Sequence, residues 1–166
     1  MKDELYMSKT HKRILFVCTG NTCRSPMAEV LAKTLAENGG FRRIEVRSAG
    51  TSAAPGHSAS EGALRAAHRH GLALRDHVST PLSPELIAWA DLVLAMGPAH
   101  LARIRELGGT GKSALLGAFS EGEDGALEPA VPDPFGGDDE TYEATFRTLE
   151  EMVTAALDRL SKEQRE

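Results

Sequence analysis

Apolar positions along this chain follow two spacings, one typical of β-strands and the other of α-helices. Compact apolar runs of strand length stand at residues 13–18, 44–46, 92–96 and 113–116. Segments with helical spacing follow these runs, at residues 26–38, 58–70, 84–89, 98–107 and beyond residue 139. The pattern therefore predicts strands that alternate with helices.

Alternation of this kind is typical of a parallel sheet whose crossover connections are helices. We expect an α/β fold: a single-domain, four-stranded parallel sheet flanked by helices on both faces. The domain should span residues 13–163, and the polar, aperiodic residues 1–12 should form a flexible N-terminal tail. Ligands of such folds bind at the carboxyl ends of the strands. Because the first strand ends at Cys18, we expect the site there.

Composition limits the possible partners. The 166 residues carry a formal net charge of −5, which argues against nucleic acid or an anionic membrane as the main partner. No run approaches the ~18 apolar residues of a membrane span, and no signal peptide is recognisable. The two cysteines, Cys18 and Cys23, do not suggest a secreted disulfide scaffold. We therefore expect a cytoplasmic protein.

The segment between the first strand and the first helix combines the parts of a phosphate site. Cys18 ends the strand, and Arg24, whose planar fork matches a phosphoryl group, follows with five residues between them. Gly20 and Asn21 tolerate the left-handed backbone that lets successive N–H groups surround an anion. With Ser25 as the predicted N-cap, Cys18 faces the positive end of the helix, which favours its thiolate. The predicted phosphate-binding loop comprises Thr19, Gly20, Asn21, Thr22, Cys23 and Ser25.

This loop and its flanks resemble the opening motif of the low-molecular-weight protein-tyrosine phosphatase family. The motif reads Phe16-Val-Cys-Thr-Gly-Asn-Thr-Cys-Arg-Ser-Pro-Met-Ala-Glu29 in this chain. The likeness continues in the family's order at Arg47-Ser48-Ala49-Gly50, His77-Val78-Ser79, residues 90–96 and Asp133-Pro134-Phe135-Gly136-Gly137. It covers roughly residues 12–160, and it implies the family's fold and a protein phosphatase activity.

The resemblance assigns Cys18 as the nucleophile, Arg24 as the clamp of the transition state and Asp133 as the general acid. It implies two displacements through a phosphocysteine, with phosphorylated proteins as substrates and no metal or other cofactor. Two prolines flank Asp133 and stiffen its backbone. The resemblance also implies that hydrogen bonds hold Asn21 in a strained conformation. The matching partners are Ser25, Ser48 and His77.

Thr22 bears on which phosphoryl group is hydrolysed. Family members that act on phosphotyrosine usually carry an aliphatic residue at this position, whereas the branch that hydrolyses phosphoarginine carries threonine. Phe135 also resembles the arginine branch and offers a ring to stack on a planar guanidinium. The loop at 50–54 lacks the aromatic residue that many relatives place beside the substrate. We favour phosphoarginine, with phosphotyrosine as the alternative.

Two other functions fit this chain less well, and the second cysteine of the loop bears on regulation. Arsenate reductases of the same fold relay electrons through further cysteines, and this chain has none after Cys23. A non-catalytic phosphate-binding module is expected to lose Cys18, Arg24 or Asp133, and all three are present. Cys23 is the candidate redox partner that traps an oxidised Cys18 as a disulfide. Inorganic phosphate, vanadate or arsenate should inhibit by occupying the loop.

Overall fold

The computed structural model describes residues 12–39 and 43–165 of the chain. Four strands form one parallel sheet in the order β2-β1-β3-β4, which confirms the predicted α/β fold. Their bounds are β1 Lys12–Cys18, β2 Ile44–Gly50, β3 Leu92–Ala95 and β4 Ser113–Leu115. The chain order reverses at β1, which lies between β2 and β3, so the end of β1 is the switch point where ligands of such sheets bind.

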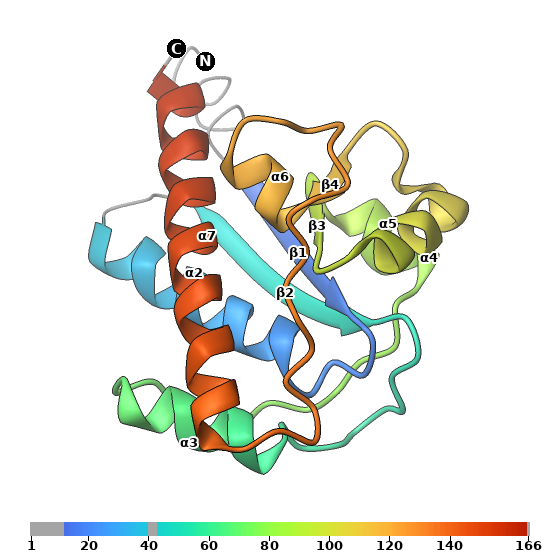
Figure 1. Ribbon diagram of the computed structural model, residues 1–166. Coiled ribbons are helices and arrows are strands. Elements are labelled where there is room, and N and C mark those ends of the chain that lie inside the picture. The colour runs from blue at the N-terminus through green and yellow to red at the C-terminus, as the bar shows by residue number, and fades with distance from the viewer. Residues whose placement is uncertain (1–11, 40–42, 166) are drawn as a thin grey trace.

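Helices cover both faces of the sheet (Figure 1). One layer contains α2 (Arg24–Gly39), α3 (Glu61–Arg69) and the long α7 (Asp139–Arg165), and the other contains α4 (Pro84–Trp89) and α5 (Pro98–Ile104). A π-helical turn, η1 (Arg105–Gly109), extends α5, and α6 (Leu116–Ser120) follows β4 directly. No helix within the described residues is long and apolar enough to cross a membrane.

Strand β1 lies at the centre of both hydrophobic layers. Ile14 and Phe16 pack toward α2 and α7, whereas Leu15 and Val17 pack toward α4 and α5. All four are at most 1% exposed. Because successive side chains of a strand point to opposite faces, an uninterrupted apolar run such as 14–17 requires cover on both sides. This double burial fixes the position of Cys18 at the end of the strand.

Several boundaries differ from those predicted from the sequence. Strand β1 begins at Lys12, inside the predicted tail, because the Lys12 N–H donates to the Arg43 carbonyl beside β2. The rest of that tail, residues 1–11, lies outside the described residues. At the other end α7 continues to Arg165, past the predicted boundary at 163. Helix α6 was not predicted, since five residues are too few to show a helical period.

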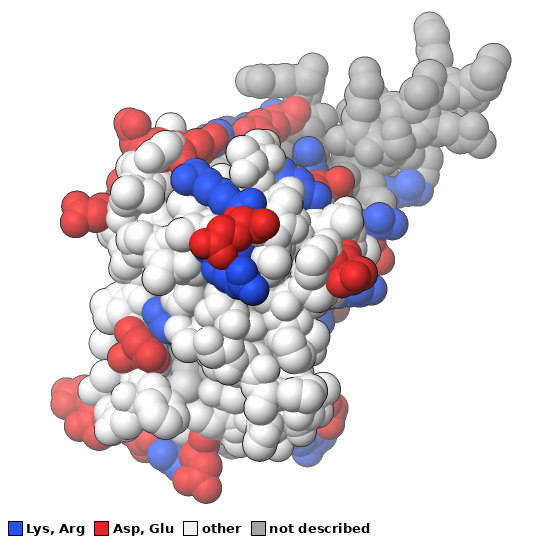
Figure 2. All heavy atoms as spheres, turned by 90° about the vertical axis from the view of Figure 1, so that its right-hand side faces the viewer, with Lys and Arg blue, Asp and Glu red and all other residues white. Residues whose placement is uncertain are grey.

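Among the described residues, charged side chains on the face that carries α4 and α5 do not form a large patch of one sign (Figure 2). Figure 2 shows acidic and basic side chains interspersed there among a wider uncharged area. An interspersed surface of this kind gives no long-range field of one sign over this face.

Candidate active site

The loop that follows β1 has the curled shape expected of an anion-binding loop. Cys18 ends the strand at 2% exposure, and α2 begins at Arg24. Asn21, at the middle of the loop, has a positive φ of 56°. This left-handed conformation turns the chain back on itself between the strand and the helix.

Helix α2 begins earlier than predicted, so the expected N-cap role of Ser25 is wrong. The first intrahelical bond runs from Met27 N–H to the Cys23 carbonyl, which places Cys23 at the cap position. Ser25 therefore lies within the first turn, and its hydroxyl points inward to the Cys18 sulfur at 2.9 Å. Because Ser25 Oγ accepts a hydrogen bond from Asn21 Nδ2 at 2.8 Å, its own hydrogen is available to the sulfur.

Asn21 is held by four hydrogen bonds from three parts of the chain. Its Nδ2 donates to Ser25 Oγ and to Ser48 Oγ at the end of β2, the latter at 2.9 Å. Its Oδ1 accepts from the Thr80 N–H at 2.8 Å, and its carbonyl accepts from His77 Nε2 at 2.7 Å. Asn21 is fully buried, so these bonds also satisfy polar atoms that water does not reach. Together they offset the cost of the left-handed backbone.

The network continues beyond Ser48 to a residue that sequence reasoning missed. Ser48 Oγ donates to Glu29 Oε1 at 2.5 Å, and Glu29 also pairs with Lys33 one helical turn further along α2. A carboxylate at this position orients the Ser48 hydroxyl so that its oxygen accepts from Asn21.

The guanidinium of Arg24 is anchored inside the protein. Its Nη1 donates to the Val131 carbonyl at 3.0 Å and its Nη2 donates to Thr19 Oγ1 at 3.4 Å. Asp133 Oδ2 lies 3.6 Å from the same Nη2. The Arg24 side chain is 8% exposed and that of Asp133 is 52% exposed. The arginine is therefore fixed below the surface, while the carboxylate stands at the rim with access to solvent.

A cavity of about 220 Å³ joins the loop to the segment around Asp133. Phe135 stands at its mouth and is 76% exposed, and its backbone N–H donates to Asp133 Oδ1. The fold thus brings together residues separated by more than a hundred positions. The cavity is lined by Cys18, Thr19, Gly20, Thr22, Cys23, Arg24, Asp133 and Phe135.

The remaining predicted site residues lie outside this cavity. Asn21, Ser25, Ser48 and His77 do not line it, and the hydrogen bonds described above join them to one another. Within the described parts of the chain, no group of three or more His, Cys, Asp or Glu side chains is arranged to hold a metal ion.

Cys23 is the second cysteine of the loop and is 5% exposed. Its sulfur is 3.2 Å from Ser60 Oγ and 3.4 Å from the Tyr142 hydroxyl. Burial and the contact with Cys23 raise the pKa of Tyr142, so the phenol stays protonated. Tyr142 is itself 4% exposed, so it supports Cys23 from within the core and does not form a wall of the cavity.

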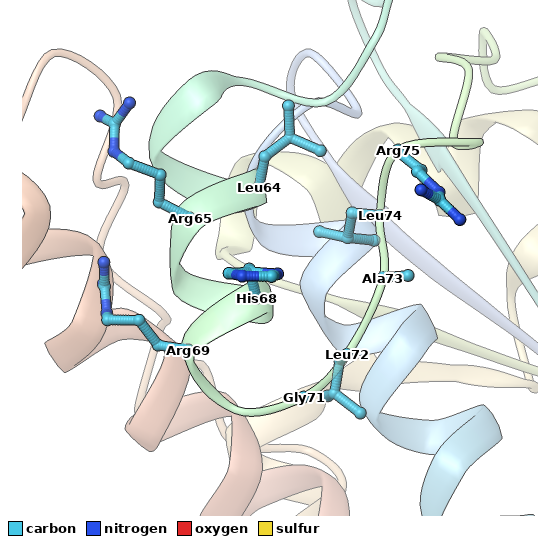
Figure 3. Close-up of a pocket in the computed structure, with 9 residues that line it drawn as sticks. All are labelled: Leu64, Arg65, His68, Arg69, Gly71, Leu72, Ala73, Leu74 and Arg75. Carbon is cyan, nitrogen blue, oxygen red and sulfur yellow. The ribbon is translucent and has the colours of Figure 1, made fainter.

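A larger hollow of about 800 Å³ lies elsewhere, between α3 and residues 71–75. Figure 3 shows its apolar floor at Leu64 and Leu74, while Arg65 and Arg69 point away from that floor. Both arginines pair with Asp139 at the start of α7. The hollow contains no cysteine or serine nucleophile, so the smaller cavity at Cys18 is the candidate active site.

Comparison with known proteins agrees with this geometry. The YwlE arginine phosphatase, solved as a mutant with a phosphorylated active-site serine, superposes with a TM-score of 0.85 and 42% identity, over 92% of this chain and 98% of that one. The tyrosine phosphatase Wzb from Escherichia coli K30, solved in complex with sulphate, has a TM-score of 0.78 and 32% identity, over 90% and 99% of the two chains.

Sequence comparison leads to the same group of proteins. The protein-arginine-phosphatase of Bacillus subtilis is 43% identical over an alignment of 159 residues, and the match covers 92% of this chain and 99% of that protein. Residues 13–166 match the family model of low molecular weight phosphotyrosine protein phosphatase. The chain therefore belongs to the low molecular weight phosphotyrosine protein phosphatase family.

Proposed function

We propose that this protein is a cysteine-dependent protein-arginine phosphatase that acts through a phosphocysteine intermediate. One observation carries the proposal: a single cavity contains a buried thiol, an anchored guanidinium and an exposed carboxylate. Those groups correspond to the nucleophile, the phosphoryl clamp and the general acid of a two-step phosphoryl transfer.

In the first step the Cys18 thiolate attacks phosphorus, and an S–P bond forms as the P–N bond of phosphoarginine breaks. Asp133 gives its proton to the departing guanidino nitrogen. The Arg24 guanidinium and the N–H groups of the loop stabilise the equatorial oxygens. The hydrogen bond from Ser25 stabilises the thiolate before the attack and again when it is released.

In the second step water attacks the phosphocysteine. Asp133, now ionised, takes a proton from that water. The oxygen of the water bonds to phosphorus, and the P–S bond breaks. Inorganic phosphate leaves, and Cys18 returns to the thiolate. Asp133 is suited to both proton transfers because its side chain is half exposed and stands at the rim of the cavity.

Thr22 and Phe135 are proposed to select phosphoarginine. Both line the cavity that contains Cys18. The Thr22 hydroxyl offers a hydrogen-bond acceptor to a guanidinium, and it replaces the apolar surface that would pack against a phenyl ring. The exposed ring of Phe135 offers a face on which a planar cation can stack. The relative named protein-arginine-phosphatase, at 43% identity, supports this assignment.

The test compares phosphate release from matched phosphoarginine and phosphotyrosine peptides. We expect the wild-type protein to prefer phosphoarginine, Cys18→Ser to be inactive on both, and Thr22→Ile to gain activity on phosphotyrosine. A wild-type preference for phosphotyrosine would contradict the assignment and favour a tyrosine phosphatase with the same mechanism.

Phosphate, vanadate and arsenate should act as competitive inhibitors in the same assay. We place this activity in the cytoplasm as part of the proposal.

A reversible redox switch at the two cysteines is also proposed. Both are free thiols that line the cavity. Peroxide oxidises the Cys18 thiolate to a sulfenic acid and is itself reduced to water, and the Cys23 thiol then forms the disulfide as a second water leaves. After peroxide treatment, dithiothreitol should restore the activity of the wild type but not that of Cys23→Ser. Equal recovery of the two proteins would exclude a protective disulfide.

A further inference from the structure

His100, on α5, is a buried histidine at the active site that the mechanism above does not use. It is 7% exposed, and its Nε2 lies 2.8 Å from Thr19 Oγ1, an atom of the phosphate-binding loop. Among the described residues, two buried side-chain nitrogens lack a hydrogen-bond partner: His100 Nδ1 and Arg24 Nε. Both nitrogens belong to this part of the site. Hydrogen bonds within the protein therefore do not satisfy all of its buried polar atoms.

The unpaired Nδ1 indicates which tautomer His100 adopts. A neutral imidazole carries its proton on one nitrogen and a lone pair on the other. A buried N–H without an acceptor is rarer in proteins than an acceptor without a donor. The proton therefore belongs on Nε2, and Nε2 donates to Thr19 Oγ1.

The charge state of His100 agrees with this hydrogen bond. Burial, and then the positive charge of Arg24, lower the pKa of His100 from 6.5 to about 4, and Asp133 offsets part of this effect. At neutral pH the imidazole is uncharged, so it places no second positive charge beside Arg24. A lysine or arginine at this position would not have that property.

Thr19 receives two hydrogen bonds, one from His100 Nε2 and one from Arg24 Nη2. With both lone pairs of the hydroxyl engaged, its own hydrogen is directed away from the two donors. Thr19 lines the cavity, so a phosphoryl oxygen bound there is the acceptor that this hydrogen can reach. A hydroxyl held in this way presents a donor that needs no reorientation when charge develops on the phosphoryl group.

We propose that His100 is a positioning residue for phosphoryl transfer, which fixes the Thr19 hydroxyl as an acceptor for Arg24 and as a donor to the bound phosphoryl group. The inference rests on the proposed catalytic function and adds a role for α5, which the sequence motifs do not include. The imidazole does not line the cavity, so the effect of His100 on a bound phosphoryl group passes through Thr19.

The experiment measures kcat and KM for an activated aryl phosphate, and the affinity for vanadate, in a set of variants. His100→Leu removes the donor, and His100→Gln keeps an N–H near the position of Nε2. Thr19→Val removes the hydroxyl, and the double variant His100→Leu/Thr19→Val tests their coupling. Ile104→Val is the matched control, since Ile104 is a fully buried core residue of the same helix. Urea unfolding of each variant verifies the fold.

We expect His100→Leu and Thr19→Val each to lower kcat about tenfold, with little change in KM and a similar loss of vanadate affinity. His100→Gln should recover most of the activity, and the double variant should lose no more than either single one. Ile104→Val should keep wild-type kcat despite its lower stability.

Three results would overturn the inference. They are an unchanged kcat in His100→Leu, losses that multiply in the double variant, and a His100→Gln as impaired as His100→Leu. In each case an active wild type leaves the proposed function standing. A wild-type protein that hydrolyses neither the aryl phosphate nor a phosphoarginine peptide overturns the proposed function itself, so the two failures are distinguishable.

Discussion

Replacing His100 with glutamine should reduce the loss of folding stability that acid causes. In the folded protein the pKa of His100 is lowered from 6.5 to about 4, chiefly by burial. In the unfolded chain the His100 imidazole binds a proton near pH 6.5. In the folded protein the imidazole stays unprotonated down to about pH 4. Acid in that window therefore favours the unfolded state. Glutamine does not titrate, so the variant loses this contribution to the pH dependence.

The size of the effect follows from the displacement of the pKa. At about 1.36 kcal/mol per pKa unit, the change from 6.5 to about 4 corresponds to about 3 kcal/mol in total. Above the pKa of the unfolded chain, the contribution of His100 to the free energy of unfolding is fully present. Between about pH 7 and pH 5 this contribution falls by ~2 kcal/mol. The free energy of unfolding of the wild type should fall by that amount relative to the variant.

Urea unfolding at several pH values, followed by circular dichroism, measures this difference directly. Every other titrating group is common to the two proteins, so its contribution cancels in the comparison. Any constant offset between the proteins, from changed packing, is also removed because only the change with pH is compared. Parallel curves for the two proteins between about pH 7 and pH 5 would refute a buried, neutral His100.

Three further substitutions test other parts of the site. Asp133→Asn should slow hydrolysis of substrates with poor leaving groups by a factor on the order of 10²–10⁴ and affect activated aryl phosphates far less; equal losses would exclude Asp133 as the acid. Arg24→Lys keeps the charge but loses the planar fork, so kcat should fall about 10²-fold in steady-state assays, and a normal kcat would contradict bidentate clamping. Gly62→Ala adds a methyl group that overlaps the Tyr142 ring, and should lower the free energy of urea unfolding by roughly 1–3 kcal/mol. Unchanged stability would show that the packing beneath Cys23 is looser than described.

The order of strands and helices was predictable because it depends on local periodicity. The apolar run at 92–96 contains the buried strand β3, which ends one residue earlier at Ala95, and Ser83 caps α4 as its position before Pro84 suggests. Helix α2 begins one to two residues earlier than the sequence pattern predicts. Serine is a preferred cap residue, but the curled loop requires the Ser25 hydroxyl to face Cys18 instead.

Some contacts between distant segments could be predicted from the family resemblance, and the others could not be predicted from the sequence. The resemblance named His77 and Ser48 as partners of Asn21, yet the Thr80 N–H that completes its hydrogen bonds carries no side-chain signal. His100 stands in a short apolar helix, where a single histidine is more often a core residue than part of a site. Nothing in its sequence neighbourhood links it to Thr19.

By itself the sequence determined the candidate nucleophile and the loop predicted to bind phosphate. Cys18, Arg24 and the residues between them form one short segment, so the geometry of that loop follows from local backbone preferences at the end of a strand. The tertiary structure alone decided the approach of Asp133 to within 3.6 Å of Arg24 and the contact of His100 with Thr19. Those distances depend on how the helices and loops after β3 and β4 pack around the end of β1, and packing between distant segments has no local pattern in the chain.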